Sequence, residues 1–279
     1  MNKTKIDWCD KTWNPVTGCL NDCPYCYARG IANRFGGAYD NLLGGNRIIQ
    51  PYEVLPEIVE GVIHTQMMIA TGSGDTMTMR KAAYPMGFAP TYHKLRLEDP
   101  ALMIKPKNIF VCSMADIFGE WVPDEWIREV FQACAAAPQH RHIFLTKNPS
   151  RYTDLNDSNA LPTGNNFWFG TTITQKSEQR LVNHTPNYYG RPTPTHRNAF
   201  INFEPLLDDS ACDLIKYYGY CYKWVIVGAE TGNRKGKVIP KREWIMDIKA
   251  ACEEAGIPLF MKESLKRLMG PEFIQQFPW

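Results

Sequence analysis

The sequence predicts an α/β protein built as a partial or complete parallel β/α barrel, with residues 1–279 in a single domain. From about residue 90 onward, short apolar segments alternate with amphipathic ones, and this alternation is typical of parallel strands joined by helices. A charged residue stands at the end of five of these segments, where a barrel places its active-site groups. The length of 279 residues also suits a single barrel domain.

The first part of the chain is expected to be less regular than the rest. Residues 13–17 are expected to end a strand and turn, and residues 27–35 to form a helix. Residues 36–89 are expected to form an insertion that is helical. Apolar residues recur at helical spacing over residues 55–70, and Pro56 suits the first turn of a helix.

The regular part of the chain is expected to contribute six strands, at residues 108–112, 142–145, 166–170, 199–203, 223–227 and 257–261. A helix beginning at Pro123 has acidic residues in its first turn, which favours a helix start. Its expected buried residues are Trp126, Ile127, Val130, Phe131 and Cys134. A short helix is expected near residues 175–182.

A further helix is expected over residues 241–255, where Gly256 would cap its end. Its expected buried residues are Trp244, Ile245, Ile248 and Cys252. The charged residues that follow the strands are Asp116, Lys147, Glu204, Glu230 and Lys262. Any one of them can be a solvated loop charge, but five at the strand ends of one barrel indicate a functional site.

The composition narrows the class of protein. The net charge of +2 creates no overall basic field that would demand a nucleic-acid partner, and it excludes none. Residues 1–5 lack the apolar region of a signal peptide, and no apolar run approaches the length of a membrane span. The nine cysteines are therefore expected to be reduced thiols in the cytoplasm rather than a disulfide framework.

Three cysteines stand close together near the N-terminus. Cys19, Cys23 and Cys26 have C-x3-C-x2-C spacing, and neighbouring thiolates at this spacing favour a soft metal. A structural zinc site needs four protein ligands, and Cys9 is the only nearby candidate for a fourth. A [4Fe–4S] cluster held by three thiolates keeps one iron open for chemistry. The spacing favours the cluster, and a zinc knuckle stays open as the alternative.

The cysteine loop, with Tyr25 directly before its third cysteine, resembles the signature of the radical S-adenosylmethionine (radical SAM) superfamily. Further motifs resemble a branch found in bacteriophages and prophages that is distantly similar to spore photoproduct lyase. These motifs are residues 13–19, 23–28, 113–118, 145–151, 204–207 and 224–232. The resemblance covers nearly the whole chain except residues 36–89.

The resemblance implies a [4Fe–4S] cluster bound by the three cysteines, with SAM chelating the open iron. An external one-electron reductant such as flavodoxin or ferredoxin would supply the electron that cleaves SAM into methionine and a 5′-deoxyadenosyl radical. That radical would abstract a hydrogen atom from the substrate. The residues expected to bind SAM are Tyr25, Ser113, Asp116, Lys147, Glu204, Glu230 and Lys262.

The substrate expected from the resemblance is a modified nucleobase, a nucleoside or DNA. The reaction would belong to the isomerase, lyase or transferase class. Arg234 and Lys235, just after the Glu230 strand end, are expected to contact this substrate. A peptide or a small metabolite is the alternative substrate. Two further classes stay open: a zinc-stabilised nucleic-acid-binding module without catalysis, and a barrel hydrolase that uses the carboxylates with a hard metal such as magnesium.

Overall fold

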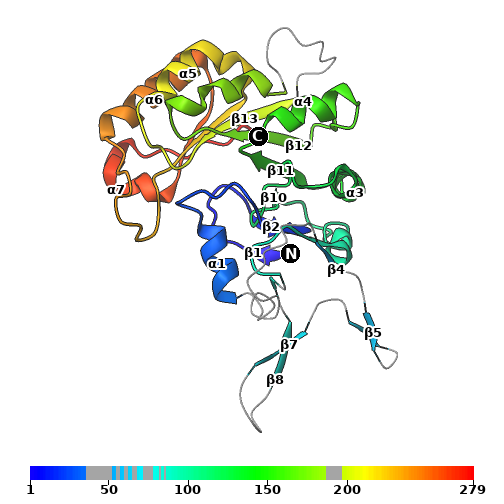
Figure 1. Ribbon diagram of the computed structural model, residues 1–279. Helices are drawn as coiled ribbons and strands as arrows, with labels where there is room; N and C mark the ends of the chain where they lie inside the picture. Colours follow the sequence, from blue (N-terminus) through cyan, green and yellow to red (C-terminus); the bar gives the residue numbers. More distant parts are fainter. Residues whose placement is uncertain are drawn as a thin grey trace. The chain divides into compact units, whose positions relative to one another are not determined.

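The computed structural model describes residues 1–35, 52–54, 57–59, 62–64, 68–71, 78–81, 83–84, 86–186 and 197–279 (Figure 1). It contains two compact units, which are described separately. Unit 1 consists of Met1–Asn2, Thr12–Lys105 and Val111–Pro138, and unit 2 of Lys3–Lys11, Pro106–Phe110 and Gln139–Trp279. A single domain over the whole chain stays a prediction. None of the helices within the described residues has the length and apolar character to cross a bilayer.

Unit 2 is built on a parallel sheet whose strands follow one another in chain order. The strands are β10 (Asn108–Val111), β11 (Arg141–Thr146), β12 (Phe167–Thr172), β13 (Asn198–Phe203), β14 (Trp224–Val227) and β15 (Leu259–Met261). Each strand pairs in parallel with the next. All six strands lie at the positions that the alternating pattern predicts, and the α/β class with a parallel sheet is confirmed.

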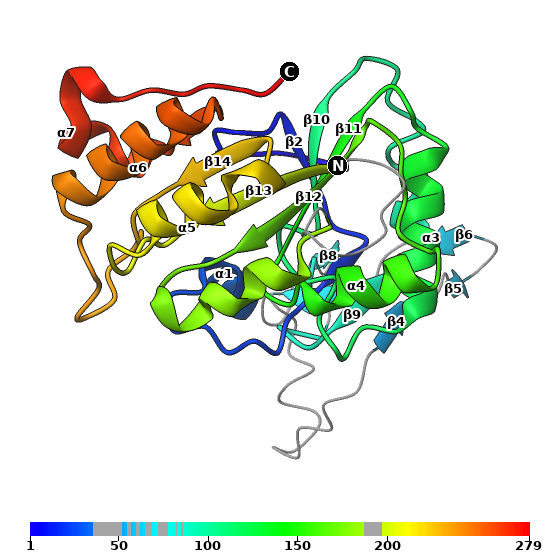
Figure 2. The same ribbon diagram turned by 90° about the horizontal axis from the view of Figure 1, so that it is seen from above.

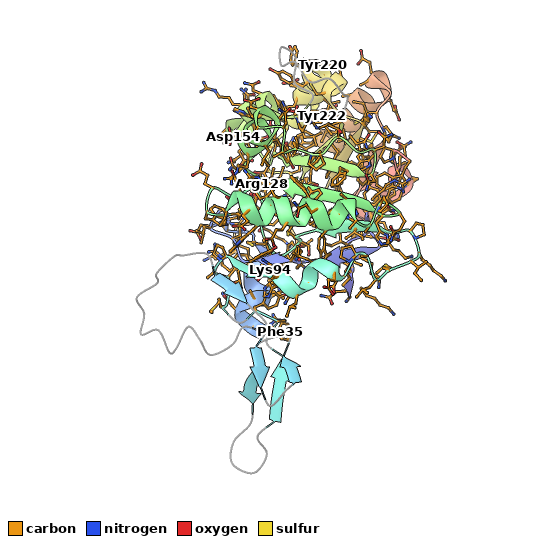
Figure 3. All side chains as sticks on the ribbon, turned by 90° about the vertical axis from the view of Figure 1, so that its right-hand side faces the viewer. Phe35, Lys94, Arg128, Asp154, Tyr220 and Tyr222 are labelled. Carbon is orange, nitrogen blue, oxygen red and sulfur yellow. The ribbon has the colours of Figure 1, made fainter. Side chains whose placement is uncertain are left out.

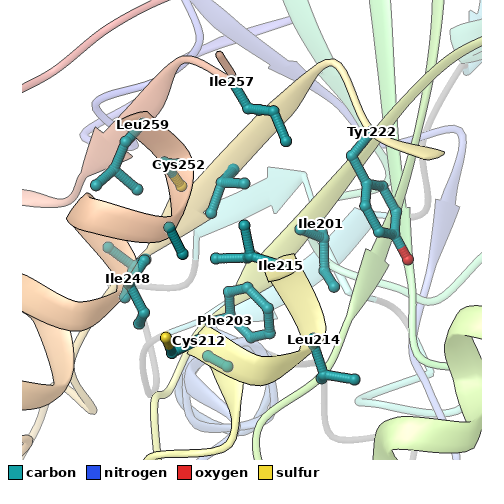
Figure 4. Packing of buried hydrophobic residues seen from close by; sticks show 14 of the residues in the cluster. Ile201, Phe203, Cys212, Leu214, Ile215, Tyr222, Ile248, Cys252, Ile257 and Leu259 are labelled. Atoms are coloured by element: carbon teal, nitrogen blue, oxygen red, sulfur yellow. The ribbon is translucent and has the colours of Figure 1, made fainter. Parts of the chain in front are cut away.

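Helices cover one face of this sheet. They are α4 (Ser150–Asp157), α5 (Ala211–Tyr218) and α6 (Arg242–Ala255), and α5 and α6 lie side by side against β13 and β14 (Figure 2). The 3-10 segments η3 (Lys176–His184) and η4 (Gly219–Cys221) precede and follow α5. Alternate strand residues such as Ile201 and Phe203 pack on Ile215 and Ile248 of the helices, which buries this face (Figure 4).

The predicted last helix is confirmed as α6, and Gly256 ends it in the left-handed conformation with φ of +66°. Its N–H donates to the carbonyl groups of Cys252 and Glu253, as a capping glycine does. Trp244 packs against the same buried cluster as predicted, but it is only partly buried. It lies at the edge of the buried face of α6, and Lys241 Nζ is 5.5 Å from the centre of its ring.

The other face of the sheet, called here the inner face, carries a second apolar cluster. Its members are Trp8, Phe110, Ile143, Trp168, Phe200, Trp224, Ile226 and Phe260. Residues near the end of the chain cover part of it, because Phe277 and Trp279 pack on the Trp224 ring at 5.8 and 5.2 Å. Strand residues alternate between the two clusters, as the two-residue period of a strand requires.

The free edge of β15 is occupied by the end of the chain. Phe260 forms an antiparallel bridge with Gln275, Met261 N–H donates to Ile274 O at 2.9 Å, and Gln276 N–H donates to Leu259 O at 3.0 Å. Three short elements lead there: η5 (Glu263–Leu265), α7 (Lys266–Met269) and η6 (Gly270–Glu272). Within the described residues this edge therefore does not pair with another parallel strand, and closure into a barrel is not confirmed.

Unit 1 contains the helix that follows the cysteine loop, α1 (Tyr27–Phe35), at the predicted position. Its three-stranded sheet consists of β3 (Val16–Thr17), β9 (Thr91–His93) and β4 (Tyr52–Val54). The short strands β1 (Asn2–Lys3) and β2 (Lys11–Trp13) lie near the N-terminus. Residues 13–17 therefore end one strand and begin another, close to the prediction.

Helix α3 (Asp124–Ala135) begins after Pro123 as predicted, and all five residues expected in its buried face are buried. The Trp126 ring stacks on Tyr92 of β9 at 4.9 Å. Glu129 accepts hydrogen bonds from the Tyr92 hydroxyl and, at 3.3 Å, from Lys94 of the 3-10 segment η2 (Lys94–Glu98; Figure 3). These contacts fix β9, and β9 in turn pairs with the strand that enters the cysteine loop.

The prediction of a helical insertion is wrong over the described residues. Residues 57–81 contain two antiparallel pairs, β5 (Glu57–Val59) with β6 (Val62–His64) and β7 (Met68–Thr71) with β8 (Thr78–Lys81). The apolar spacing that suggested a helix is carried largely by β-branched residues, which favour strands. The rest of the predicted helix lies outside the described residues.

Gly170 should be intolerant of any side chain. A Cβ at this position would lie 2.2–2.6 Å from three atoms of the buried Phe200 ring. We expect Gly170→Ala to lower the free energy of unfolding by about 1–3 kcal/mol through overpacking, as measured by urea titration. Adding Phe200→Leu should restore part of the loss.

Gly30→Ala is the matched control, because a Cβ at Gly30 meets nothing within 4 Å. It should leave the free energy of unfolding unchanged or raise it by about 0.4–1 kcal/mol. Equal stability of Gly170→Ala and the wild type would contradict the packing described for the inner face.

Candidate functional site

The cysteine loop of unit 1 is anchored at its first residue. Gly18 has φ of +86°, and its N–H donates to Met114 O at 2.9 Å. A Cβ on Gly18 would lie 2.1 Å from Ala89 O, so both the conformation and the space require glycine. Cys19 N–H donates to Phe88 O at 3.2 Å and continues the attachment. The loop therefore starts from a fixed position.

The three thiols of the loop are partly exposed and unbridged. Cys26 directly precedes α1, and its Sγ accepts the backbone N–H of Arg29 at 3.4 Å. Cys26 Sγ therefore lies at the N-terminal end of α1, where backbone N–H groups point toward it. The Arg29 guanidinium pairs with Asp22, and its positive charge also interacts with Cys26 and Cys19.

Asp116 stands beside this loop. It is buried, its Oδ2 accepts a hydrogen bond from Asn21 Nδ2 at 3.0 Å, and its Oδ1 accepts the N–H of Phe118 at 3.1 Å. Burial, and then the Asp116 charge, raise the pKa of Cys19 to about 12. Of the charged residues predicted at the strand ends, Asp116 is therefore the one next to the thiols within unit 1.

Ser113 and Tyr25 also lie in unit 1, and Ser113 is tied into its backbone. Ser113 Oγ donates to Asn14 Oδ1 at 3.2 Å, and Asn14 Oδ1 also accepts Met114 N–H at 3.0 Å. The hydroxyl of Tyr27 donates to Ser113 O at 2.7 Å, which connects the start of α1 to the same segment. Tyr25 is partly buried. The segment of Ser113 and the cysteine loop therefore hold one another in place.

The donor set fits an iron–sulfur cluster by its chemistry. Three unbridged thiols lie in one short loop, which is the number of protein ligands that a [4Fe–4S] cluster with one open iron takes. As they stand, the described side chains include no group of three or more His, Cys, Asp or Glu that could hold a metal ion. Cys9, the candidate for a fourth ligand, belongs to unit 2, where burial raises its pKa to about 12.

In unit 2, two of the predicted residues form an ion pair on the inner face. Lys262 Nζ donates to Glu204 Oε1 at 2.6 Å, and both side chains are mostly buried. Gly228 lies beneath the pair, since a Cβ there would lie 3.0 Å from Lys262 Cδ and 3.2 Å from Glu204 Cγ. The absence of a side chain at Gly228, directly after β14, is what lets the pair lie against the sheet.

Asn202 is a polar residue of the inner face whose side-chain oxygen accepts no hydrogen bond from the described residues. It lies between Phe200 and Glu204 in the two-residue alternation of β13, and it is buried. Its Nδ2 donates to Thr172 Oγ1 at 3.4 Å, whereas its Oδ1 has no hydrogen-bond partner among the described residues. A buried oxygen of this kind needs a donor from a ligand or a water molecule. Thr172, Asn202, Glu204 and Lys262 are called the inner-face polar site below.

Glu230 and Arg234, predicted to bind SAM and substrate, are engaged with each other. Arg234 Nε and Nη2 donate to the two carboxylate oxygens of Glu230 at 2.6 and 2.7 Å. The Glu230 side chain is only 1% exposed, and the hydrogen bond from Arg234 lowers its pKa. Glu230 therefore anchors the loop that follows β14. Lys235 is exposed, and Lys147, at the end of β11, is partly buried.

Sequence reasoning missed several residues of these sites. Asn202, Thr172 and Gly228 were not predicted, although an asparagine within an otherwise apolar strand is a usable signal. Asn14 and Asn21 were also missed, and nothing in their spacing distinguishes them from loop residues. The structure places Asp116 in unit 1, whereas Lys147, Glu204, Glu230 and Lys262 lie in unit 2. The convergence of these five residues at one mouth stays a prediction.

The fold and these sites define an α/β protein with a mostly parallel sheet, a three-cysteine loop and a separate polar site. The family model described as "Protein of unknown function (DUF5131)" matches residues 3–266, and the chain belongs to this family. No curated protein matches the chain.

Two solved structures are similar to this chain. Spore photoproduct lyase complexed with dinucleoside spore photoproduct has a TM-score of 0.50 and 10% identity, over 93% of this chain and 78% of that one. A cysteine-to-serine mutant of spore photoproduct lyase has a TM-score of 0.49 with the same identity and coverage. At this identity the likeness shows the fold alone.

His93 should make unit 1 sensitive to acid. It is buried, its Nε2 lies 2.9 Å from Thr17 Oγ1, and burial together with the Arg96 charge lowers its pKa to about 2. Below pH 6.5 the unfolded chain binds a proton that the folded chain does not, so stability falls as the pH falls. We expect His93 alone to remove about 1 kcal/mol of the free energy of unfolding between pH 6.5 and 5.5.

The measurement is urea unfolding of the wild type and of His93→Gln at several pH values. The variant should have a lower free energy of unfolding at pH 7.5 but a smaller further loss toward pH 5.5. Identical pH slopes in the two proteins would show that His93 is protonated equally in the folded and unfolded states.

Proposed function

We propose that this protein is a radical SAM enzyme that acts on a substrate containing a nucleobase. The observation that carries the proposal is the three-thiol loop, anchored at Gly18 and lying next to the buried Asp116 and the start of α1. The likeness of the fold to spore photoproduct lyase, a radical SAM enzyme, supports it. The unmet acceptor of the inner-face polar site supports a second, organic ligand.

Cys19, Cys23 and Cys26 would hold a [4Fe–4S] cluster. Such a cluster, reduced by flavodoxin or ferredoxin, supplies the electron for reductive cleavage of SAM, which leads to hydrogen abstraction from the substrate. Arg29 and the N-terminus of α1 offset the negative charge of the thiolates. Asp116 has the chemistry to accept hydrogen bonds from the amino group of SAM.

The inner-face polar site of unit 2, taken by itself, also carries side chains with the chemistry to bind groups that SAM contains. Lys262 can neutralise a carboxylate, and Glu204 can accept hydrogen bonds from ribose hydroxyl groups. Asn202 Oδ1 has the free acceptor that an exocyclic amine of a base would satisfy. Glu230 has a different role in this proposal, since Arg234 occupies both of its carboxylate oxygens and makes it an anchor of the loop.

A nucleobase-containing substrate is favoured over a peptide or a small metabolite by the ligand of the similar structure, a dinucleoside spore photoproduct. The branch found in phages and prophages, and a place in the cytoplasm, belong to the same proposal. The branch rests on the resemblance of the motifs around residues 13–28 and 113–118.

The test is anaerobic reconstitution with iron and sulfide, followed by reduction in the presence of SAM. We expect a brown protein with about four irons and four sulfides per chain, and 5′-deoxyadenosine among the products. Candidate nucleosides and oligonucleotides are then added as substrates. A colourless protein that binds only zinc would support the nucleic-acid-binding module instead, and activity without SAM would support a hydrolase.

Replacing Cys19, Cys23 or Cys26 singly with Ala should abolish the cluster, because two thiolates rarely hold one. Iron and sulfide content and the visible absorption spectrum measure this. Cys134→Ala and Cys252→Ala are the controls, since both thiols are buried in apolar clusters of helices. Full iron and sulfide in Cys19→Ala would show that the ligands are assigned wrongly.

Glu204→Gln and Lys262→Met should weaken SAM binding by about tenfold or more while leaving the iron content unchanged. Each substitution removes one charge of the pair, and the partner left behind is mostly buried and loses its opposite charge. Binding of SAM is measured by calorimetry on the reconstituted protein. Lys223→Met, which removes a lysine bonded to Asn198 at the other end of β13, is the control. Unchanged affinity in both test variants would exclude the pair from the SAM site.

A further inference from the structure

We propose that residues 231–242, called here the cationic loop, bind the phosphate backbone of a polynucleotide strand. The substrate would then be a nucleic-acid strand rather than a free nucleoside. This inference rests on the proposed function, because it specifies the class of substrate on which the proposed enzyme would act. The loop leaves the end of β14 and ends where α6 begins at Arg242.

The cationic loop has charge of a single sign. It contains Arg234, Lys235, Lys237, Lys241 and Arg242, and no Asp or Glu. The whole chain has a net charge of only +2, so this stretch concentrates positive charge that the rest of the sequence balances. Clustered cations of this kind form the electrostatic footprint of a phosphate-binding surface.

The loop is held in one shape by its own interactions. The buried Glu230 carboxylate receives both donors of Arg234, and Lys237 Nζ donates to Gly232 O at 3.0 Å. Gly232 and Gly236 have φ of +84° and +75°, a conformation that glycine adopts without strain. A loop that is ordered before binding loses little conformational entropy when a ligand arrives. A solvated linker would not need a buried carboxylate to shape it.

These contacts divide the cations into two groups. Two cations are engaged within the loop: Arg234 is a positioning residue, because its charge is matched by Glu230, and Lys237 donates to Gly232 O. Lys235, Lys241 and Arg242 are exposed and can meet phosphates. Ile239 lies among them and is 74% exposed, which offers an apolar contact for a sugar or a base. Alternating cations and an apolar side chain suit a strand whose phosphates and bases both face the protein.

The loop begins next to the inner-face polar site. Gly228, beneath the Glu204–Lys262 pair, is the residue after β14, and the loop starts three residues later. Ala229 N–H donates to Ser264 Oγ at 3.0 Å, which fixes the start of the loop against η5. A strand whose phosphates lie on the cationic loop would therefore bring its bases toward the polar site. A free nucleoside would leave these cations without a role.

The test is binding of a fluorescent single-stranded oligonucleotide to the reconstituted full chain at several salt concentrations, without SAM or reductant. Each phosphate contact on a single strand contributes a slope of about 0.7 to the plot of log affinity against log salt. Lys235→Gln/Lys241→Gln should reduce the slope by about 1.4 and the affinity at 100 mM salt by about tenfold or more. Lys105→Gln/Lys216→Gln removes two exposed lysines from other elements and should bind like the wild type.

Arg234→Lys tests the positioning role. It keeps the charge but loses the bidentate hydrogen bond to Glu230, which shapes the loop. The affinity should therefore fall while the salt slope stays near that of the wild type. An affinity equal to that of the wild type would remove this role.

Three results would overturn the inference. One is undetectable binding of the oligonucleotide at low salt, and another is an equal effect of the two double variants. The third is equal affinity and slope for polyglutamate, which would identify a surface for acidic peptides. Because binding is measured without SAM, none of these results decides the proposed radical SAM chemistry, which stands or falls on cleavage of SAM.

Discussion

A parallel sheet has to be covered on both faces, and this constraint shapes unit 2. Helices α5 and α6 bury one face, while Trp8 and the residues near the end of the chain cover part of the other. On the inner face the apolar cluster reaches Phe200 on β13 and Ile226 on β14, and polar groups follow beyond it. Asn202, Glu204 and Lys262 stand there. The position of the polar site therefore follows from how the sheet is buried.

Much of the fold of unit 2 could be predicted, because strands buried on both faces appear in the sequence as short apolar runs. Helices α3 and α6 also combine clear start or stop signals with an apolar face. Helix α4 was missed because few of its residues are apolar, and only Tyr152 and Leu155 are buried. Helix α5 was missed because it is short and its tyrosines obscured the pattern. The insertion was wrongly predicted as helical because its apolar residues recur at helical spacing. Many of them are β-branched, however, and β-branched residues favour strands.

The sites divide in the same way. The cysteine loop was predictable because its ligands are neighbours in sequence, and the residues at strand ends were predictable from strand direction. Partners were not predictable, because they depend on contacts in space. Glu204 pairs with Lys262 across 58 positions, and Asp116 bonds to Asn21 across 95. Arg234 was assigned to a substrate phosphate from its charge, but the buried Glu230 at i−4 already engages it.

The segment that lies along β15 has a consequence for solubility. An edge strand with unpaired N–H and C=O groups is a template for strand addition by another molecule, and Gln275 and its neighbours occupy this edge through backbone hydrogen bonds. The same segment brings Phe277 and Trp279 onto the rings of Phe260 and Trp224. Displacing it would expose a hydrogen-bonding edge and an aromatic patch together. Shortened chains or bulky additions at this end would therefore be prone to self-association while leaving the cysteine loop intact.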